Sequence, residues 1–509
     1  MTIETKDKDD KVEVTLKDVN IEATIDKAAM SVTGSGNTTI KLDGDNHLTG
    51  GNGSSGISSS GSLTITGGET DSLTAKGGSG EDGGDGIFSK DLTISGGTVT
   101  ATGGDSTGSD GSGSYGIFST NTTTISGGTV TATGGDSTGS YSSGGYGIYS
   151  SGVTISGGTV TANGGSGKDG SGDGIFSFDP VAISGGTVTA KGGSGEDGKD
   201  GGDGIRSFDP VAISGGTVTA KGGSGEDGSG GRGIISTKSV TISGGSTVTA
   251  NGGNGGSLVG GDGIRSDGGV TISGNTVNAA GGNGGKVGGY GICSFDRVAI
   301  SGGTVEAAGG SSGSSNGGSG IYSSVIDLSG SLELTAKAGS PNGKALSQKG
   351  SELVLDTIKD KLGPGAKVTA TDADGKVIDQ VPIPRPVEPE KPVIPEESSS
   401  SSGGGSAAPS APASFLPGLT VTDKDGQRIS YTSTQSGNTL TVCVGRFTAS
   451  FRISLAALRQ LRAEGIEAIT FQTILCSTTL SLDELLAMGG EDAEAVLTHR
   501  LTDSSLTVG

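Results

Sequence analysis

The stretch GIFSFDPVAISGGTVTAK, residues 174–191, decides the fold of this chain. It returns as GIRSFDPVAISGGTVTAK at residues 204–221, and the segments 178–198 and 208–228 are identical over 21 residues. A copied segment is expected to be a structural unit, because a single catalytic pocket needs unique residues at one place. Internal repetition of this kind is the signature of a solenoid.

Two phrases of this stretch repeat in phase. The tetrad Gly-Ile-x-Ser recurs at intervals of 27 to 31 residues, with its isoleucine at positions 57, 87, 117, 148, 175, 205, 234, 264, 292 and 321. The phrase Ile-Ser-Gly-Gly-Thr-Val, or a close variant, follows each time, with its isoleucine at positions 65, 94, 125, 155, 183, 213, 242, 272 and 300. A disordered chain would not keep two phrases in phase over this length.

Each repeat predicts three short strands and one glycine-rich loop. Ile, Val and Thr alternate with other residues, as in half-buried strands, and Ser-Gly-Gly supplies a corner where glycine tolerates positive φ. One unit cannot bury its apolar face alone, so successive units must stack in register. The sequence therefore predicts an all-β fold: a single-stranded parallel β-helix of about 12 coils, each of about 30 residues. Parallel crossovers favour a right-handed winding.

The composition changes twice towards the C-terminus. We expect the β-helix to span residues 1–380, a Pro/Ser/Gly-rich linker to span 381–417 and a small α+β domain to span 418–509. In that domain Ser454 is the predicted N-cap of one helix and Gly465 its C-cap, while Ser481 is predicted to open a second helix with a capping box. The sequence of this domain does not indicate its role.

Charge limits the partners. The 509-residue chain has a formal net charge of −21 and 104 glycines. Nucleic acid is therefore excluded as a partner, because phosphate binding requires a basic surface. No apolar run is long enough to span a membrane. The first eleven residues are polar and charged, without the apolar stretch of a signal peptide.

The N-terminal coils resemble a known family. Residues 14–21 (VTLKDVNI), 39–50 (TIKLDGDNHLTG) and 56–65 (GISSSGSLTI) are similar to the opening coils of a bacterial family described as carbohydrate-binding domain-containing proteins, which form right-handed parallel β-helices. The resemblance covers residues 10–375. It implies a non-catalytic polysaccharide-binding protein at the cell surface or outside the cell, with calcium as an assisting ion.

An aromatic column is the first candidate site. If the isoleucine of each tetrad points inward, the following residue points outward. Aromatic rings at this position, and others two residues before the isoleucine, could pack against sugar rings along the rod. The alternative is that these rings stack on one another and stabilise the coils. The predicted carbohydrate-binding residues are Phe88, Phe118, Tyr149, Phe176, Tyr322, Tyr115 and Tyr146.

Acidic glycine-rich loops are the second candidate site. Ca²⁺ prefers several oxygen ligands on a compact flexible loop, which Asp and glycine carbonyl groups can supply. The alternative is a solvated loop that keeps the surface soluble. The predicted metal ligands are Asp82, Asp85, Asp197, Asp200, Asp203 and Asp227.

The sequence leaves three candidate functions open. The first is a calcium-assisted, non-catalytic polysaccharide-binding protein, and the second is a structural rod or adhesin that acts as a spacer at the cell surface. The third, a polysaccharide lyase or hydrolase, would need carboxylates and a basic residue that converge in one groove. We expect no enzyme, because the only histidines, His47 and His499, belong to different domains and no cluster of Asp with His and a basic residue is visible.

Overall fold

The computed structural model describes residues 1–24, 26–196, 198–314, 316–384, 418–423, 427–429, 431–436, 438–444, 449–473, 477–490, 493–499 and 504–508. The chain forms two compact units, Met1–Glu390 and Lys391–Gly509. The predicted metal ligand Asp197 and residues 385–417 of the predicted linker lie outside the described residues.

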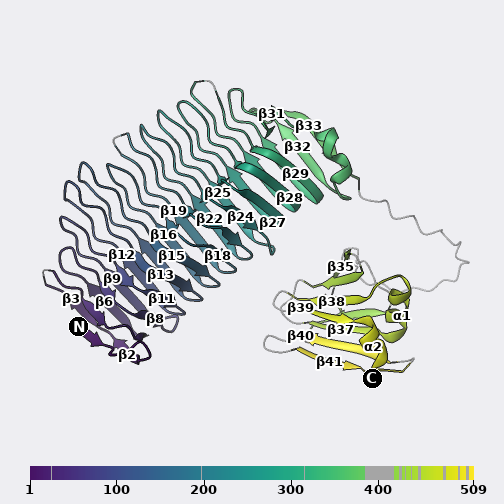
Figure 1. Ribbon diagram of the computed structural model, residues 1–509, viewed down its shortest axis with the longest axis horizontal. Coiled ribbons are helices and arrows are strands. Elements are labelled where there is room, and N and C mark those ends of the chain that lie inside the picture. Colours follow the sequence, from purple (N-terminus) through teal and green to yellow (C-terminus); the bar gives the residue numbers. More distant parts are fainter. Residues whose placement is uncertain are drawn as a thin grey trace, which may run out of the picture. The chain divides into compact units, whose positions relative to one another are not determined.

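The first unit is one continuous sheet of 33 strands, wound into a parallel β-helix. Each coil up to that of β29 contributes one segment to each of three parallel ladders, and the last coil contributes β30 and β32. Successive coils follow one another from the N-terminus towards β33 (Figure 1). The predicted all-β, parallel β-helix fold is confirmed.

The first ladder contains the Gly-Ile-x-Ser tetrads. Its members are β1 (Thr2–Glu4), β4 (Met30–Thr33), β7 (Ile57–Ser59), β10 (Ile87–Ser89), the starts of β13 (Ile117–Ile125) and β15 (Ile148–Ile155), β17 (Ile175–Ser177), β20 (Ile205–Ser207), β23 (Ile234–Ser236), β26 (Ile264–Ser266), the starts of β28 (Ile292–Ala308) and β29 (Ile321–Lys337), and β30 (Leu346–Gln348).

The second ladder contains the strands that precede the Ser-Gly-Gly corner. Its members are β2 (Lys11–Lys17), β5 (Asn37–Asp43), β8 (Ser62–Thr66), β11 (Asp91–Ile94), β18 (Val181–Ile183), β21 (Val211–Ile213), β24 (Ser239–Ile242), the start of β27 (Gly269–Ala280), and later segments of β13, β15, β28 and β29.

The third ladder follows the corner. Its members are β3 (Asn20–Glu22), β6 (Asp45–Thr49), β9 (Ser72–Lys76), β12 (Thr98–Thr102), β14 (Thr129–Thr133), β16 (Thr159–Asn163), β19 (Thr187–Lys191), β22 (Thr217–Lys221), β25 (Thr247–Asn251), the ends of β27, β28 and β29, and β32 (Lys367–Thr371).

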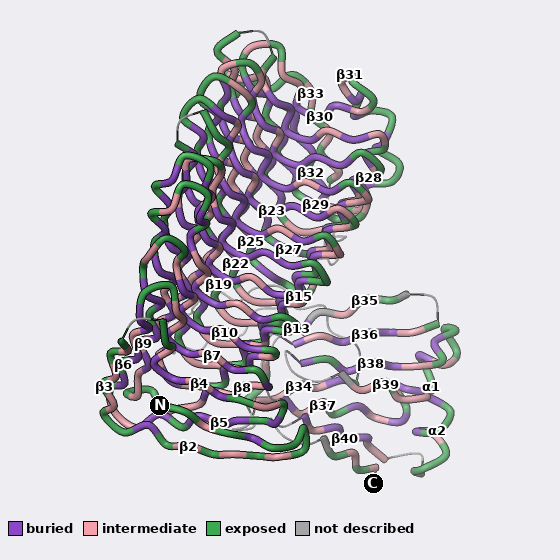
Figure 2. Tube along the Cα trace, turned by 60° about the vertical axis from the view of Figure 1, so that its left-hand side comes forward, coloured by how far each residue is buried: buried purple, intermediate pink, exposed green. Residues whose placement is uncertain are grey.

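Identical residues stack on one another. Ile87 pairs with Ile117, and Val99 pairs with Val130, in exact one-coil steps. The tetrad isoleucines from Ile57 to Ile321 are fully buried in one thin core. Buried positions recur along every coil (Figure 2). Each buried isoleucine stabilises the stack by roughly 1.5–3 kcal/mol relative to an exposed one.

The serine of the tetrad recurs because its side chain is buried and makes hydrogen bonds within the stack. It lies two residues after the isoleucine and therefore also points inward, and Ser177 is fully buried. Its hydroxyl lies 2.7 and 2.8 Å from the backbone carbonyl oxygens of Ser151 and Asp179, and its one proton can be donated to either of them. A small donor at this position satisfies carbonyl groups where the chain turns away from the ladder.

The C-terminal end of the stack is covered. β33 (Val377–Pro382) pairs antiparallel with β32, and the 3-10 helix η1 (Leu355–Lys361) buries Leu355 and Ile358. The two-residue strand β31 (Ser351–Glu352) pairs with β30. This short antiparallel cover reduces the length of unpaired strand at this end of the sheet. β33 ends at Pro382.

The described residues of the second unit form two four-stranded sheets and two helices. One sheet has the order β34 (Leu419–Thr422), β37 (Ala449–Ser454), β40 (Glu494–His499) and β41 (Ser504–Val508). The other has the order β35 (Thr432–Ser436), β36 (Thr439–Cys443), β38 (Ala468–Gln472) and β39 (Ser477–Ser481).

The helices of this unit are α1 (Leu455–Ala463) and α2 (Leu482–Ala487). Ser454 caps α1 as predicted, since its hydroxyl accepts a hydrogen bond from Ala457 N at 3.2 Å. Gly465 has the expected positive φ. The predicted capping box at Ser481 is wrong, because α2 begins there without a side-chain cap.

The Ser-Gly-Gly corner generates a testable prediction. Gly216 and Gly245 both have positive φ, but a Cβ at Gly216 would lie 2.5 Å from the Gly186 carbonyl oxygen, whereas at Gly245 it would meet nothing within 4 Å. We expect Gly245→Ala to cost about 1–2 kcal/mol for the left-handed backbone. Gly216→Ala should cost distinctly more, because the clash adds to the same backbone penalty. Urea unfolding of both variants measures the difference, and equal losses would show that close coil contact is unimportant.

Candidate functional site

The outward residues of the first ladder form a column. Successive residues after the tetrad isoleucine pair directly across neighbouring coils, from the N-terminal to the C-terminal part of the rod. The column contains Phe88, Phe118, Tyr149, Phe176, Arg206, Ile235, Arg265, Cys293 and Tyr322. The isoleucines beside them are buried, so the column lies on the outer face of the ladder.

Tyrosines two residues before the isoleucine join this column. Tyr115 stacks on Tyr149 with ring centroids 4.8 Å apart and planes 5° apart. Tyr146 stacks on Phe176 at 5.0 Å, and Tyr149 stacks on the same ring at 5.1 Å. Phe118 stands edge-on to Tyr149 at 5.1 Å. The structure thus brings six of the seven predicted aromatic residues into one cluster. Phe88 joins this cluster through its edge-on contact with Phe118.

The seventh predicted residue lies further along the rod. Tyr322 stacks on Tyr290 at a centroid distance of 4.8 Å. Burial raises the pKa of both Tyr115 and Tyr290 to about 12, so these hydroxyls stay protonated at neutral pH.

Much of the surface of these rings is occupied by neighbouring rings. Phe176 is only 6% exposed, and Tyr149 has parallel rings on both sides, from Tyr115 and Phe176. Such stacking contributes about 0.5–1.5 kcal/mol per pair beyond simple burial. The stacked rings therefore stabilise the coils, and their faces are less available to a ligand than the sequence analysis expected.

More exposed rings lie two residues further along the chain, at the next outward position of the same coils. Phe178, Phe208 and Phe295 are 45%, 38% and 51% exposed. Phe178 stands edge-on to both Tyr149 and Phe176, and it stacks on Phe208 with centroids 5.7 Å apart. The sequence analysis missed these residues. The signal was the repeated Ser-Phe-Asp, since the third residue after the isoleucine shares the outward direction of the first.

Arginine replaces the aromatic residue in the following coils. The Arg206 guanidinium lies 5.9 Å from the Phe176 ring centroid and 5.4 Å from that of Phe208. Arg265 lies 4.8 Å from the ring centroid of Phe295. These cation–π contacts join the aromatic cluster to a basic segment. We call the whole row, from Phe88 to Tyr322 with Phe178, Phe208 and Phe295 beside it, the aromatic–arginine strip.

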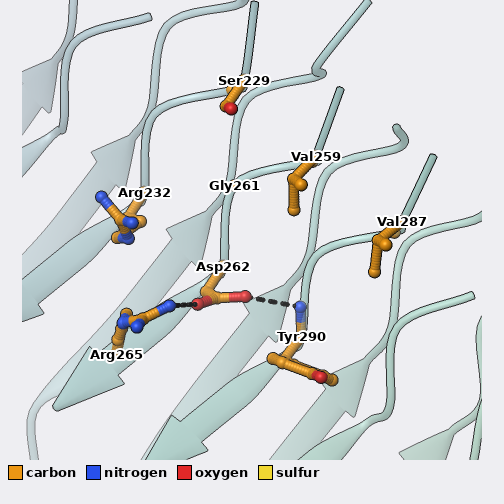
Figure 3. A pocket seen from close by; sticks show the side chains of 11 residues that line it. Ser229, Arg232, Val259, Gly261, Asp262, Arg265, Val287 and Tyr290 are labelled. Carbon is orange, nitrogen blue, oxygen red and sulfur yellow. Dashed lines mark hydrogen bonds and ion pairs between the residues drawn. The ribbon is translucent and has the colours of Figure 1, made fainter. Parts of the chain in front are cut away.

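A pocket of about 320 Å³ opens beside this strip, which contributes Arg265 to its lining. Figure 3 shows arginine side chains on one side of it, valine side chains on the other and a tyrosine ring below. The residues that line it are Ser229, Gly230, Arg232, Val259, Gly260, Gly261, Asp262, Arg265, Val287, Gly288 and Tyr290.

Asp262 connects two of the residues that line the pocket, Arg265 and Tyr290. One of its carboxylate oxygens, Oδ2, lies 3.2 Å from Arg265 Nη1, and the other accepts a hydrogen bond from the backbone N–H of Tyr290 at 2.8 Å (Figure 3). Burial raises the pKa of Asp262, against the lowering effects of Tyr290 and Arg265. The carboxyl group is thus tied to the next coil on one side and to an arginine on the other.

The predicted metal ligands have a different arrangement from a calcium loop. Asp85 accepts a hydrogen bond from Tyr115 N at 3.0 Å, and Asp200 and Asp203 accept from the backbone N–H groups of Ser229 and Arg232, each at 2.6 Å. In every case the donor belongs to the next coil. These carboxylates act as side-chain extensions of the parallel ladder.

The fit to calcium is poor among the described residues. Asp82 and Asp227 are exposed, and nowhere in the described ranges do three or more Asp, Glu, His or Cys residues gather as metal ligands. Ca²⁺ takes six to eight oxygen ligands, which single carboxylates spread over separate coils do not supply. We therefore assign no role to calcium from this geometry.

A buried carboxyl pair lies between the aromatic and basic segments. Asp173 accepts a hydrogen bond from Asp203 N at 2.6 Å, and its other oxygen has no partner within the described part of the chain. Burial, and then the neighbouring charge of Asp203, raise the pKa of Asp173 well above its usual range. Asp203 itself lies 3.7 Å from Arg206 and 3.8 Å from Arg232.

Comparison with known proteins agrees with this architecture. A family model described as a beta helix repeat matches residues 92–117, 124–148, 153–175, 181–205 and 211–234. The protein is a parallel β-helix repeat protein. Neither the comparison with curated proteins nor that with solved structures returned a match. Among its described residues, this β-helix protein has no helix of the length and apolarity needed to cross a membrane.

Asp85 gives the β-helix a testable pH dependence. Burial raises the pKa of Asp85 from 3.8 to about 6, so the folded state holds this proton more tightly than the unfolded state. The stabilisation is fully present below pH 3.8 and is lost as the pH rises through about 6. We expect Asp85→Asn to remove this part of the decline in unfolding midpoint between pH 5 and pH 7.5. The exposed residue Asp82, in the same loop, is the control, and an Asp82→Asn profile equal to that of Asp85→Asn would contradict the assignment.

Proposed function

We propose that the protein is a non-catalytic, extracellular or cell-surface protein that binds polysaccharide along the aromatic–arginine strip. The observation that supports this most directly is the exposure of Phe178 and Phe208 above the stacked rings. Their apolar faces can pack against the C–H faces of sugar rings, while arginine and tyrosine beside them can donate hydrogen bonds to hydroxyl groups.

The repetition of the strip suits a repetitive ligand. Each coil presents the same outward position in register with the last, so a linear polymer meets similar contacts at regular steps. Solenoids use extended surfaces of this kind for binding. A polysaccharide is a polymer with a short repeat, and the net charge of −21 argues against nucleic acid as the alternative polymer.

A structural role is the second candidate, and one observation favours it. The rings of Tyr115, Tyr146, Tyr149 and Phe176 lie against one another, which stabilises the rod whether or not a ligand binds. In that case the β-helix is a spacer or an adhesin rod. The two functions differ in what they require of Phe178 and Phe208, whose exposure a spacer does not need.

Retention on immobilised polysaccharides tests the proposal. The full chain is passed over neutral and acidic polysaccharides, once with Ca²⁺ and once with chelator. We expect the double variant Phe178→Ala/Phe208→Ala to bind about tenfold more weakly, because two exposed ring contacts are lost. Tyr141→Ala is the matched control, since Tyr141 is 73% exposed and its ring belongs to none of the ring pairs in the strip.

The outcomes separate the two candidates. Weaker binding of the double variant with an unchanged unfolding midpoint supports polysaccharide binding on this face. Loss of binding with chelator would add calcium to the complex, and release of new reducing ends would show catalysis. If no polysaccharide retains the full chain in either condition, the spacer function takes precedence.

A further inference from the structure

The pocket beside Arg232 carries more positive than negative charge. Among its lining residues, Arg232 and Arg265 are cationic and Asp262 is the anionic partner of Arg265 at 3.2 Å. This excess is local, because the chain as a whole has a net charge of −21.

Arg232 is the lining arginine whose guanidinium N–H groups are open to a ligand. Its ion pair with Asp203 Oδ1 is 3.8 Å long, beyond hydrogen-bond distance, and among the described residues its guanidinium donates no hydrogen bond. Asp203 also faces Arg206, at 3.7 Å, so one carboxylate serves two guanidinium groups. About a third of the Arg232 side chain is exposed, which leaves its planar fork open to a ligand.

Neighbouring carboxyl groups do not remove this excess. Asp173 does not line the pocket, and burial and the neighbouring charge of Asp203 raise its pKa, which disfavours its charged form. Asp267 acts on Arg265 only through the longer-range field, and it is exposed to solvent and salt, which screen its charge.

The other walls suit a sugar ring. Val259, Val287 and Tyr290 provide apolar surface opposite the arginines (Figure 3), and four of the remaining lining residues are glycines that leave room for a bulky unit. The volume of about 320 Å³ is at the lower end of the range of small-molecule sites. It therefore fits one unit of a polymer better than a larger ligand.

We propose that this pocket binds the anionic group of an acidic sugar unit, a carboxylate or a sulfate, in a polysaccharide that lies along the strip. This inference rests on the proposed function and adds the substrate class. The guanidinium group of Arg232 donates hydrogen bonds to the carboxylate or sulfate oxygens. Arg265 is held in place by Asp262 and Phe295. The sugar ring packs against Tyr290 and the two valines.

Matched polymers test the inference. The full chain is titrated at low salt with polygalacturonate and with its methyl ester, which has the same backbone without the charge. Dextran sulfate and dextran form the second pair, and they distinguish sulfate from carboxylate as the source of the anion. We expect one charged polymer to bind at least tenfold more tightly than its neutral partner, and salt to weaken that preference.

Variants locate the preference. Arg232→Gln should lower affinity for the charged polymer by about tenfold or more, because a charge-assisted contact is lost, and it should lower affinity for the neutral polymer much less. Arg232→Lys should restore little, since an ammonium group lacks the fork. Lys221→Gln is the control, because it removes one exposed positive charge from the third ladder.

Two failures are distinguishable. If charged and neutral polymers bind equally, or if Lys221→Gln weakens binding as much as Arg232→Gln does, the acidic-sugar inference is overturned while polysaccharide binding stands. If none of the polymers binds, the proposed function fails and this inference fails with it. Unfolding midpoints of the Arg232 variants check that the rod remains intact.

Discussion

The register between coils is the constraint on which the rest of the structure depends. Each parallel ladder places a residue directly on its counterpart one repeat later, as Ile205 lies on Ile175 and Val218 on Val188. Because a slip of one residue would turn every buried side chain outward, the hydrophobic pattern and the ladder specify each other. Glycine at the corners and in the loops permits the close approach that this register needs, since a Cβ added at Gly216 would lie 2.5 Å from the Gly186 carbonyl oxygen.

The same register turns single outward residues into continuous surfaces. An aromatic residue that would be an isolated feature on a globular protein becomes a stack when its counterpart in the next coil is also aromatic, as with Tyr149 and Phe176. Carboxylates are arranged by the same rule. Asp85 and Asp203 each accept a hydrogen bond from the backbone of the next coil, so residues predicted as ion ligands also link successive coils.

The function that we propose for this architecture depends on departures from the repeat. Where Arg206 and Arg265 interrupt the aromatic column, charge and ring faces meet, and the pocket opens beside Arg232. The copied coils on their own could stabilise any rod. The departures make one face chemically distinct, and they motivate both the polysaccharide-binding proposal and the preference for an acidic sugar.

The sequence by itself determined the parallel β-helix, its inward isoleucines and the outward direction of positions such as Phe118 and Tyr149, because a period-two pattern repeated in phase leaves one way to bury the apolar face. It also located the cap of α1 at Ser454. Only the tertiary structure decided which rings are free. Phe176 is covered and Phe178 is not, although both point outward, since their exposure depends on rings in neighbouring coils. The partners of Asp85 and the charge balance around Arg232 were likewise set by atoms about 30 residues away in sequence, and no local pattern encodes such distances.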